Sequence, residues 1–445
     1  MSAAADMRPH VVVVGAGIAG IAAATELRRQ GLRVTVLERA EQVGGRAKTV
    51  PVDGTRVNIG ADFISSFSTE LLREAEASGG NVVLIPRRQR TTIVSDGVAW
   101  PLSNPFDLLH GELLSASARV RLPLLAVPVL QARRSLDPVE LARASQLDDG
   151  SADELVRHWA GAEVAARVVG PLVRGLLYWE LETTSRVPLL AMLAAARGGG
   201  DVRRVAGGME TLVDALAAGL DVQTGAAVTS VREDPQHGCV VVSVEDGAER
   251  RTEADAVICA TTAPVAAALV EGLHDGARQF LRSVAYSRTA VITCRLPAGT
   301  PPPTASALFR TDAVPLLASV NPCWESERSD GPRHIRIHVS DRGCAAWDGL
   351  DEEELARRAL EEARAAVPHD AVWTARAVPV HVWRWEQALP RFAPGYLRTP
   401  ALREPRWLDS HRIAFAGDYL LAPHLEGAWR SGRDAAARLA AAFGR

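Results

Sequence analysis

The sequence predicts an α/β fold, and two stretches at opposite ends of the chain carry most of this prediction. Near the start, a β-branched run at residues 11–14 leads into a glycine-rich turn and a helix-forming stretch that reaches residue 30. A second strand at residues 33–38 ends on an acid. Near the other end, a short strand that leads into Ala416, Gly417 and Asp418 precedes a helix of small and apolar residues. Alternating strands and helices are typical of a parallel sheet, and 445 residues are enough for more than one lobe.

The glycine-rich turn has the spacing GxGxxG, formed by Gly15, Gly17 and Gly20. The first glycine permits a tight turn, the second lets backbone amides approach a pyrophosphate, and the third allows close packing of helix on strand. The positive end of the helix then faces the phosphates. Glu38 lies 18 residues after Gly20, where an acid accepts both hydroxyls of an adenosine ribose. We therefore expect a dinucleotide to contact Gly15, Ala16, Gly17, Ile18, Ala19, Gly20, Glu38 and Arg39.

Two further segments favour a flavin over a nicotinamide. Gly44, Gly45 and Arg46 follow the ribose acid, so the chain crosses the pyrophosphate again and offers it a guanidinium fork. At the far end, Gly417 permits close backbone approach, and Asp418 can accept hydrogen bonds from ribityl hydroxyls. The helix that follows can turn its positive end to the pyrimidine side of an isoalloxazine ring. A cofactor held by both ends of the chain does not dissociate each turnover, which predicts FAD.

These motifs resemble those of the flavin-containing amine oxidase, protoporphyrinogen oxidase and phytoene desaturase superfamily. The stretches WRWEQALPRFAPGYL (383–397) and 154–180 are most similar to the protoporphyrinogen oxidase branch. The resemblance implies non-covalent FAD, because no cysteine lies just before Pro394 and Gly395. It also implies that the backbone of Val228 lies against adenine and that Asp62 passes the flavin ring, although Asp62 could instead cap a helix. The further cofactor residues that it implies are Gly60, Ala61, Asp62, Val228, Glu426, Gly427 and Ala428.

The resemblance also implies a division of the chain. A Rossmann-like FAD-binding domain is expected from residues 1–85, 205–270 and 375–445. An α+β substrate-binding domain, with a mixed sheet and helices, is expected from residues 86–204 and 271–374.

The candidate catalytic residues are those whose side chains are expected to face the flavin ring. Amine oxidases of this superfamily usually hold a lysine there, but the matching position near Val291 has none, and Lys48 is the only lysine in the chain. This favours the protoporphyrinogen oxidase or desaturase branches. His424 stands where amine oxidases have an aromatic residue, and it is either a base facing the flavin or a helix cap in the pocket wall. Trp385 and Tyr419 are candidates because they adjoin cofactor segments.

Aromatic residues elsewhere indicate the size of the substrate. Tyr178, Trp179 and Glu180 stand where the porphyrin oxidases tend to have small residues. A narrower, more aromatic pocket suits a substrate smaller than a tetrapyrrole, as in an oxidase of specialised metabolism. Further candidate pocket residues are Trp324 and Trp383.

Composition limits the partners. A net charge of −3 gives no reason to expect nucleic acid, and the five cysteines form no metal-binding pattern. No apolar run is long enough to span a bilayer, and residues 118–134 predict at most peripheral membrane contact. The start of the chain has no signal-peptide pattern, which predicts a cytoplasmic protein. The sequence allows a homodimer without specifying the assembly.

We therefore expect an FAD-dependent oxidoreductase, an oxidase or desaturase that takes a hydride from a C–C or C–N bond of a largely apolar or aromatic small molecule. Oxygen or another acceptor would reoxidise the flavin. Three alternatives stay open: a flavin amine oxidase, a non-redox isomerase or cyclase that uses reduced flavin as a platform, and a binding protein stabilised by FAD.

Overall fold

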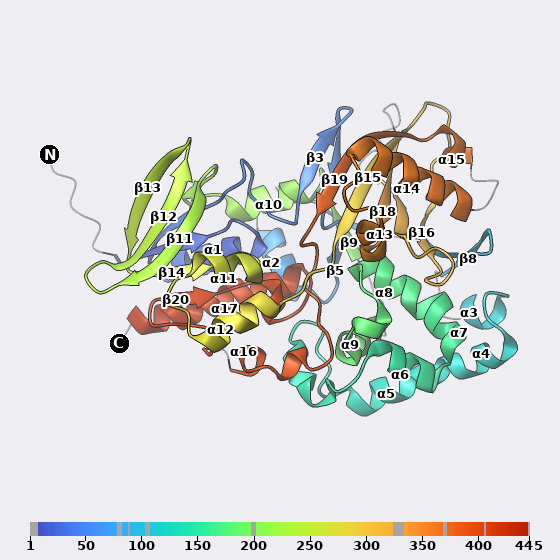
Figure 1. The fold of residues 1–445 in the computed structure, drawn as a ribbon, viewed down its shortest axis with the longest axis horizontal. Helices are drawn as coiled ribbons and strands as arrows, with labels where there is room; N and C mark the ends of the chain where they lie inside the picture. Colours follow the sequence, from blue (N-terminus) through green and yellow to red (C-terminus); the bar gives the residue numbers. More distant parts are fainter. Residues whose placement is uncertain are drawn as a thin grey trace.

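The computed structural model describes residues 8–77, 82–87, 90–102, 107–196, 202–323, 333–367, 372–404 and 406–443. Trp324 lies outside these residues. The molecule is elongated, with a sheet at each end and a group of helices below one of them (Figure 1).

A five-stranded parallel sheet has the order β10-β2-β1-β14-β20. Its strands are β1 (His10–Val14), β2 (Arg33–Leu37), β10 (Val222–Gln223), β14 (Ala256–Cys259) and β20 (Ile413–Phe415). The run of valines in β1 is fully buried, as expected for a strand covered on both faces. The sheet therefore joins strands from three separate parts of the chain.

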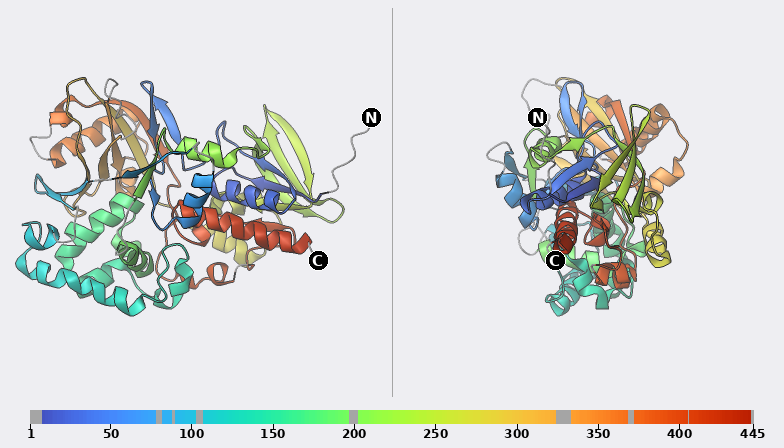
Figure 2. Two further views of the ribbon diagram at one scale, coloured as in Figure 1. Left: turned by 180° about the vertical axis from the view of Figure 1, so that it is seen from behind. Right: turned by 90° about the vertical axis from the view of Figure 1, so that its left-hand side faces the viewer.

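Each face of this sheet has its own cover. Val11 and Val13 pack with α1 (Ile18–Arg29) and α17 (Leu425–Phe443), which lie side by side (Figure 2). Val12 and Val14 pack on the opposite face, against a three-stranded antiparallel sheet and two helices. These elements are β11 (Ala227–Asp234), β12 (Gly238–Glu245), β13 (Ala248–Ala254), α11 (Ala263–Leu269) and α12 (Asp275–Ser283).

A seven-stranded mixed sheet has the order β19-β15-β18-β17-β16-β7-β8. Its strands are β7 (Arg90–Ser95), β8 (Val98–Pro101), β15 (Thr289–Leu296), β16 (Ala305–Phe309), β17 (Leu317–Pro322), β18 (Arg333–Val339) and β19 (Val378–Trp385). Only β7 and β16 run parallel among the described pairs. Ile292, Ile335 and Ile337 point to one face and pack under α14 (Glu352–Ala366). α13 (Asp341–Ala346) and α15 (Val372–Arg376) lie beside α14 (Figure 1).

The remaining elements connect these two sheets. The helical group comprises α3 (Asp107–His110), α4 (Ala116–Arg121), α5 (Ala126–Ala132), α6 (Ala152–Trp159), α7 (Ala162–Val164), α8 (Gly170–Leu177) and α9 (Arg186–Ala196). Between the sheets lie β3 (Thr49–Val52), β4 (Thr55–Asn58), β5 (Ile64–Ser65), β6 (Leu84–Arg87), β9 (Val202–Val205), α2 (Thr69–Ala77) and α10 (Met209–Ala217). α16 (Pro400–Arg403) lies below the five-stranded sheet, and its Ala401 belongs to the same core cluster as Val12 and Val14.

The five-stranded sheet draws on all three segments of the predicted FAD-binding domain. Two elements depart from the predicted division. β19 follows residue 375 but pairs with β15 in the seven-stranded sheet, and α12 follows residue 270 but packs beside the five-stranded sheet. The domain boundaries themselves stay a prediction.

The most membrane-like stretch of the sequence forms α4, a 3₁₀ turn and α5. Val120 is 78% exposed, Leu124 44% and Leu130 41%. Among the described helices, none combines the length and apolar character that crossing a membrane requires.

The contact between α1 and α17 is a backbone contact that requires glycine. A Cβ on Gly432 would stand 2.0 Å from the carbonyl oxygen of Ala19. We expect Gly432→Val to separate the helices and lower the free energy of unfolding by about 2 kcal/mol or more in urea titrations. Ala437→Val, at an exposed position of the same helix, is the control and should cost only about 0.6 kcal/mol. Equal losses in the two variants would contradict the close contact.

Candidate functional site

Two glycine loops meet at the positive end of α1. Gly17 pairs with Gly44 as an isolated bridge, and the Gly44 N–H donates to the carbonyl oxygen of Ala16 at 2.8 Å. Gly45 has φ +56°, and a Cβ on it would stand 3.3 Å from the Gly17 Cα. Gly20 has no room for a side chain either, because its Cβ would lie 1.8 Å from the carbonyl oxygen of Gly15.

This cradle fits a pyrophosphate. A Cβ on Gly17 would meet no described atom within 4 Å, so the space beside the loop is open. No described side chain caps the first turn of α1. The backbone N–H groups of this turn, starting with those of Ile18 and Ala19, are therefore available to bind an anion. The predicted phosphate residues are thus brought together, with backbone amides as their main donors.

Glu38 is fixed beside this cradle at the end of β2. One carboxylate oxygen accepts from the Ala16 N–H at 2.7 Å and the other from the Ala40 N–H at 2.8 Å. A carboxylate has about four acceptor sites, so ribose hydroxyls can still bind. The Ala226 N–H donates to the Glu38 carbonyl oxygen at 2.8 Å, which places the start of β11 and Val228 close by. Arg39 is exposed.

An ion pair between Arg46 and Asp418 joins the two ends of the chain. The guanidinium donates to both carboxylate oxygens, at 2.8 and 2.9 Å, across 372 residues of sequence. It also donates to the Ala388 carbonyl oxygen at 2.9 Å. Burial would lower the pKa of Arg46, but the neighbouring Asp418 raises it above its ordinary value. The Gly417 N–H donates to the Ser431 hydroxyl at 2.9 Å, which fixes this turn against α17.

The segment from Gly60 to Asp62 runs along Arg46. The Ala61 N–H donates to the Arg46 carbonyl oxygen at 2.9 Å, and a Cβ on Gly60 would stand 1.9 Å from that oxygen. Asp62 does not cap a helix in these contacts. Its carboxylate instead accepts from the guanidinium of Arg336 in β18 at 3.1 Å, and Arg336 is only 1% exposed. Asp62 therefore ties the cofactor segments to the seven-stranded sheet.

His424 caps α17. Its Nδ1 accepts from the Gly427 N–H at 3.0 Å, and its Nε2 donates to the Pro138 carbonyl oxygen at 2.8 Å. Burial lowers the pKa of His424, so the ring stays neutral. Because both ring nitrogens are engaged, the contacts favour the helix-cap hypothesis over the base.

Glu426 holds α17 against α2. It is fully buried, and its two carboxylate oxygens accept from the amides of Glu70 and Leu71 at 3.0 and 2.9 Å. These are N-terminal amides of α2, which a carboxylate stabilises. Glu426 was predicted to contact the cofactor, but its described contacts are with protein and with Arg430 at 2.9 Å. Ala428, two residues on, donates its N–H to the His424 carbonyl oxygen.

The other two catalytic candidates have different environments. Tyr419 is fully buried in the core cluster beside the five-stranded sheet, so its position does not support the predicted contact with substrate. The Trp385 indole N–H donates to the Ile59 carbonyl oxygen at 2.7 Å, which holds the ring beside the Gly60 segment. Its ring centre lies 5.5 Å from that of Trp383, and the Lys48 ammonium lies 4.5 Å above the Trp383 ring.

The second face of the seven-stranded sheet, opposite α14, is polar and lies next to these residues. Val291, where the family lysine was expected, pairs with Trp383 on one side and His338 on the other. In the next row, Thr293 pairs with His381 and Arg336. Directly paired residues of antiparallel strands share a face. We call Thr293, Arg336, His338, His381, Trp383 and Trp385 the polar face.

The sequence interpretation did not select His338 or Arg336. Their signal was the alternation in RHIRIHV, where every second residue of β18 is basic or imidazole. The Tyr178 hydroxyl and the His338 Nδ1 share a hydrogen bond of 3.0 Å. Tyr178 has φ +57°, a strained value for an aromatic residue, at the point where its hydroxyl meets His338. Burial raises the pKa of Tyr178, so it stays a neutral phenol.

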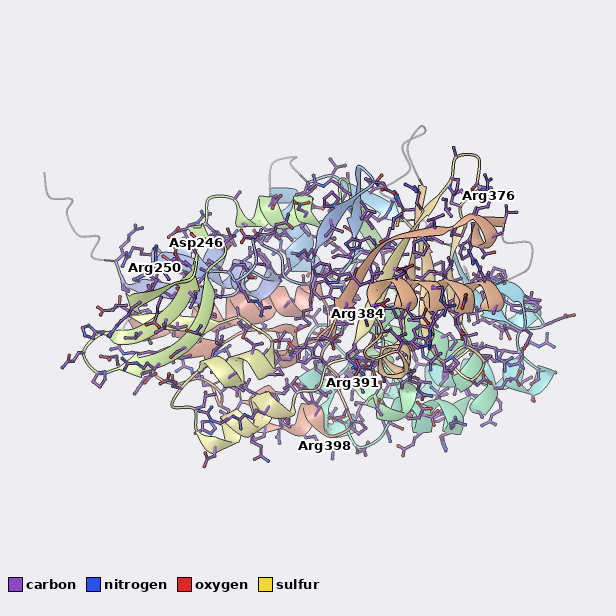
Figure 3. The ribbon with its side chains drawn as sticks, turned by 45° about the horizontal axis from the view of Figure 1, so that its top comes forward. Asp246, Arg250, Arg376, Arg384, Arg391 and Arg398 are labelled. Carbon is purple, nitrogen blue, oxygen red and sulfur yellow. The ribbon has the colours of Figure 1, made fainter. Side chains whose placement is uncertain are left out.

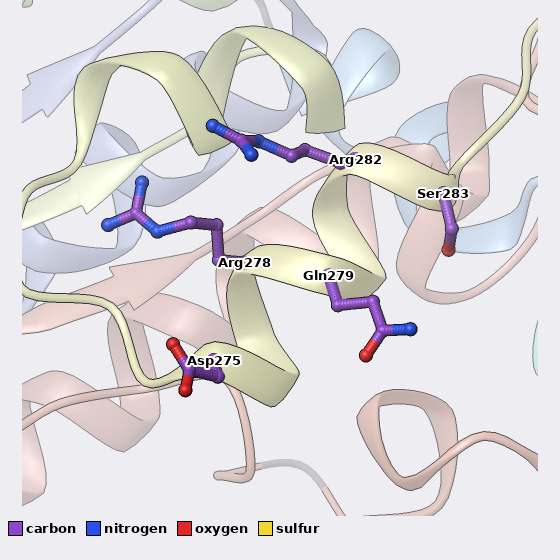
Figure 4. Close-up of a pocket in the computed structure, with 5 residues that line it drawn as sticks. All are labelled: Asp275, Arg278, Gln279, Arg282 and Ser283. Atoms are coloured by element: carbon purple, nitrogen blue, oxygen red, sulfur yellow. The ribbon is translucent and has the colours of Figure 1, made fainter.

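A shallow surface depression lies elsewhere, along one side of α12 (Figure 4). Its lining residues are Asp275, Arg278, Gln279, Arg282 and Ser283. It contains none of the predicted site residues.

The family model described as "Flavin containing amine oxidoreductase" matches residues 18–440. AofH of Mycobacterium tuberculosis, named as a flavin-containing monoamine oxidase, is 31% identical over 56% of each chain. The chain thus aligns with about half the length of that relative. Coproporphyrinogen III oxidase of Bacillus subtilis is 22% identical over 95% of each chain.

Among solved structures, wild-type putrescine oxidase bound to putrescine is similar with a TM-score of 0.76. The identity is 22%, and the match covers 98% of this chain and 99% of the other. These findings confirm the predicted α/β fold and the predicted class, an FAD-dependent oxidoreductase. The individual site residues stay predictions.

The cap formed by His424 can be tested by stability. We expect His424→Ala to lower the free energy of unfolding by about 1 kcal/mol in urea titrations, because the Gly427 amide loses its acceptor. His424→Asn should retain most of that stability, since asparagine is a good cap. Two variants with wild-type stability would show that the cap contributes nothing.

Burial and the neighbouring Arg336 lower the pKa of His338 from 6.5 to about 3, so the folded state holds this ring neutral. The unfolded chain binds a proton below about pH 6.5, so stability is fully present above that pH and falls as the solution is acidified. His338 should contribute a loss of about 2 kcal/mol between pH 7 and pH 5. His338→Gln should flatten this slope in unfolding titrations, whereas His411→Gln, at an exposed position, should not. An unchanged slope in His338→Gln would contradict a buried neutral imidazole.

The family model spans residues 18–440 and so includes α1, Arg46 and Asp418, around which the candidate site is built. The chain belongs to the flavin-containing amine oxidoreductase family.

Proposed function

We propose that the chain is an FAD-dependent oxidase or desaturase that removes a hydride from a C–C or C–N bond of a largely apolar small molecule. The observation that supports this proposal is the ion pair between Arg46 and Asp418, which joins the two parts of the chain that are predicted to bind the cofactor. FAD, when bound, supplies a two-electron acceptor. Oxygen or another small acceptor would then regenerate it.

The residues present fit a non-covalent FAD. Backbone amides near Gly17 and Gly45 would meet the pyrophosphate, Glu38 the ribose, and Arg46 with Asp418 the linking chain. No cysteine lies in residues 383–397, and burial raises the pKa of the Cys294 and Cys344 thiols to about 12. These thiols stay protonated, and a protonated thiol is a poor nucleophile for a covalent link.

The polar face also contains aromatic and apolar groups that suit a largely apolar substrate, and it offers no charged base to the reacting bond. Trp383 and Trp385 offer aromatic surface, and Val291 offers no base at the centre of the face. The histidine nearest to Val291, His338, is kept neutral. These side chains can position a substrate and exclude water, and positioning alone accounts for a large share of such a reaction.

A flavin amine oxidase is the second candidate, favoured by the names of AofH and putrescine oxidase. An ammonium substrate is held by an unpaired acid or by an open aromatic ring, and the Trp383 ring already has the Lys48 ammonium above it. Asp62 and Asp418 are already paired with Arg336 and Arg46. This pairing lowers the attraction of the site for a cation, which is why the amine reaction ranks second.

The experiment is anaerobic titration of the FAD-loaded protein with apolar small molecules and with amines. We expect an apolar compound to bleach the flavin absorbance, and oxygen to restore it with one equivalent of product. Bleaching by amines alone would replace the first function by the second. Product formation without bleaching or oxygen uptake would indicate an isomerase, and a flavin that no compound alters would indicate a binding protein.

Arg46→Met gives this experiment its matched variant. It should lower FAD affinity by at least about tenfold, because Asp418 loses its charge-assisted bidentate partner and the two ends of the site are no longer held together. Arg250→Met, on the surface of β13, should bind FAD as the wild type does (Figure 3).

A further inference from the structure

Four polar atoms on the polar face are buried and have no hydrogen-bond partner among the described residues. They are Thr293 Oγ1, His338 Nε2, His381 Nδ1 and Trp383 Nε1. All four belong to β15, β18 and β19, in two adjacent rows, one centred on Val291 and the other on Thr293. His338 is only 5% exposed and Thr293 is fully buried. A buried polar atom without a partner costs about 1–3 kcal/mol, so such a concentration indicates a place where another molecule binds.

The donor-only groups of this face fix the chemistry of that molecule. The Trp383 indole N–H can only donate a hydrogen bond. The Lys48 ammonium, above the same ring, also can only donate, and no described acid pairs with it. The His338, His381 and Thr293 atoms can act either way. An occupant that satisfies the face must therefore present acceptors.

The charge of the surroundings points the same way. Asp62 is neutralised by Arg336 at 3.1 Å, and Asp418 by Arg46 at 2.8 Å. Asp53, at the other end of β18, is shared by His334 and Arg295. Among the described residues, a further acid that acts on the polar face is Glu352, which lies on the His381 side. Lys48 has no described acid partner, so the Trp383 side of the face attracts an anion and repels a cation.

The apolar part of the occupant also has a counterpart. Trp383 lies between His381 and Trp385, with ring centres 6.4 and 5.5 Å away. Such a row of rings offers broad aromatic surface next to the unpaired donors.

We propose that the polar face binds a substrate that carries a carboxylate on an apolar body, with Lys48 as the counter-ion and the Trp383 indole N–H as a second donor. The proposal rests on the proposed function and narrows its substrate class to organic acids. Val291, between Trp383 and His338 in the first row, then contacts the apolar body of the acid. A cationic amine is repelled by Lys48 and has no acceptor for the Trp383 indole N–H.

The test compares acids and amines with the same skeleton. The FAD-loaded full chain is titrated at pH 7.5 with benzoate, 3-phenylpropionate and decanoate, and with benzylamine, phenethylamine and decylamine. Binding is followed by the change in the flavin absorbance spectrum and by the thermal midpoint. We expect at least one acid to bind about tenfold more tightly than its matched amine, because a charge-assisted hydrogen bond is worth about that factor.

Three variants at Lys48 and Trp383, with one control at Arg376, assign the effect. Lys48→Met keeps the apolar stem of the side chain and should reduce the preference to less than about threefold, and Lys48→Glu should reverse it. Trp383→Phe keeps an aromatic ring but removes the indole N–H, so it should weaken the binding of acids more than that of amines. Arg376→Met removes an exposed cation of α15 at the edge of the molecule and should leave the preference intact (Figure 3).

The two proposals fail separately. A wild-type protein that takes up FAD but binds no acid better than its matched amine overturns the carboxylate proposal alone. An equal preference in Lys48→Met and wild type also overturns it. A protein that takes up no FAD overturns the proposed function first.

Discussion

The close contact of α1 with α17 is the constraint on which the site depends. The two helices come from opposite ends of the chain, and Gly432 lets the backbone of one touch that of the other at Ala19. Because the Gly417 N–H is bonded to Ser431 of α17, this contact fixes the position of the Gly417–Asp418 turn relative to the glycine loops at α1. Arg46 can then reach both carboxylate oxygens of Asp418. Without helix packing at this distance, the charged pair and the cradle would not face the same space.

The second constraint is the alternation of side chains in β18. Isoleucines on one face build the core under α14, and the same strand directs Arg336 and His338 to the other face. Arg336 is tolerated in this buried position because Asp62 and the Asn58 carbonyl oxygen accept from it. β18 thus supplies residues both to the core under α14 and to the polar face. The ion pair between Arg336 and Asp62 holds the polar face next to the predicted cofactor segment at residues 60–62.

The cofactor side of this arrangement could be predicted from sequence, because its chemistry is local. GxGxxG, Glu38 and the Gly44–Arg46 turn each act through backbone amides or a single side chain a few residues from a strand end. The roles of residues whose side chains contact distant parts of the sequence were harder to predict. His424 and Glu426 stand in a flavin motif, yet their partners, Pro138 and the start of α2, are remote in sequence. Their capping roles therefore could not be deduced from the motif alone.

The substrate side was predicted only in outline. The absence of a lysine near Val291 was visible in the sequence, but the position of Lys48 above Trp383 required the fold. Likewise, the pairing of Tyr178 with His338 joins two segments 160 residues apart. Which side chains share the face depends on strand register, and register is fixed by the tertiary packing of all seven strands.

The central claim is that the two ends of the chain together hold one FAD without a covalent bond. The most direct measurement is the flavin content of the purified chain after heat precipitation. The account predicts about one FAD per chain, all of it released into the supernatant. A protein that contains no flavin and takes up none, or one whose flavin stays with the precipitate, would contradict it.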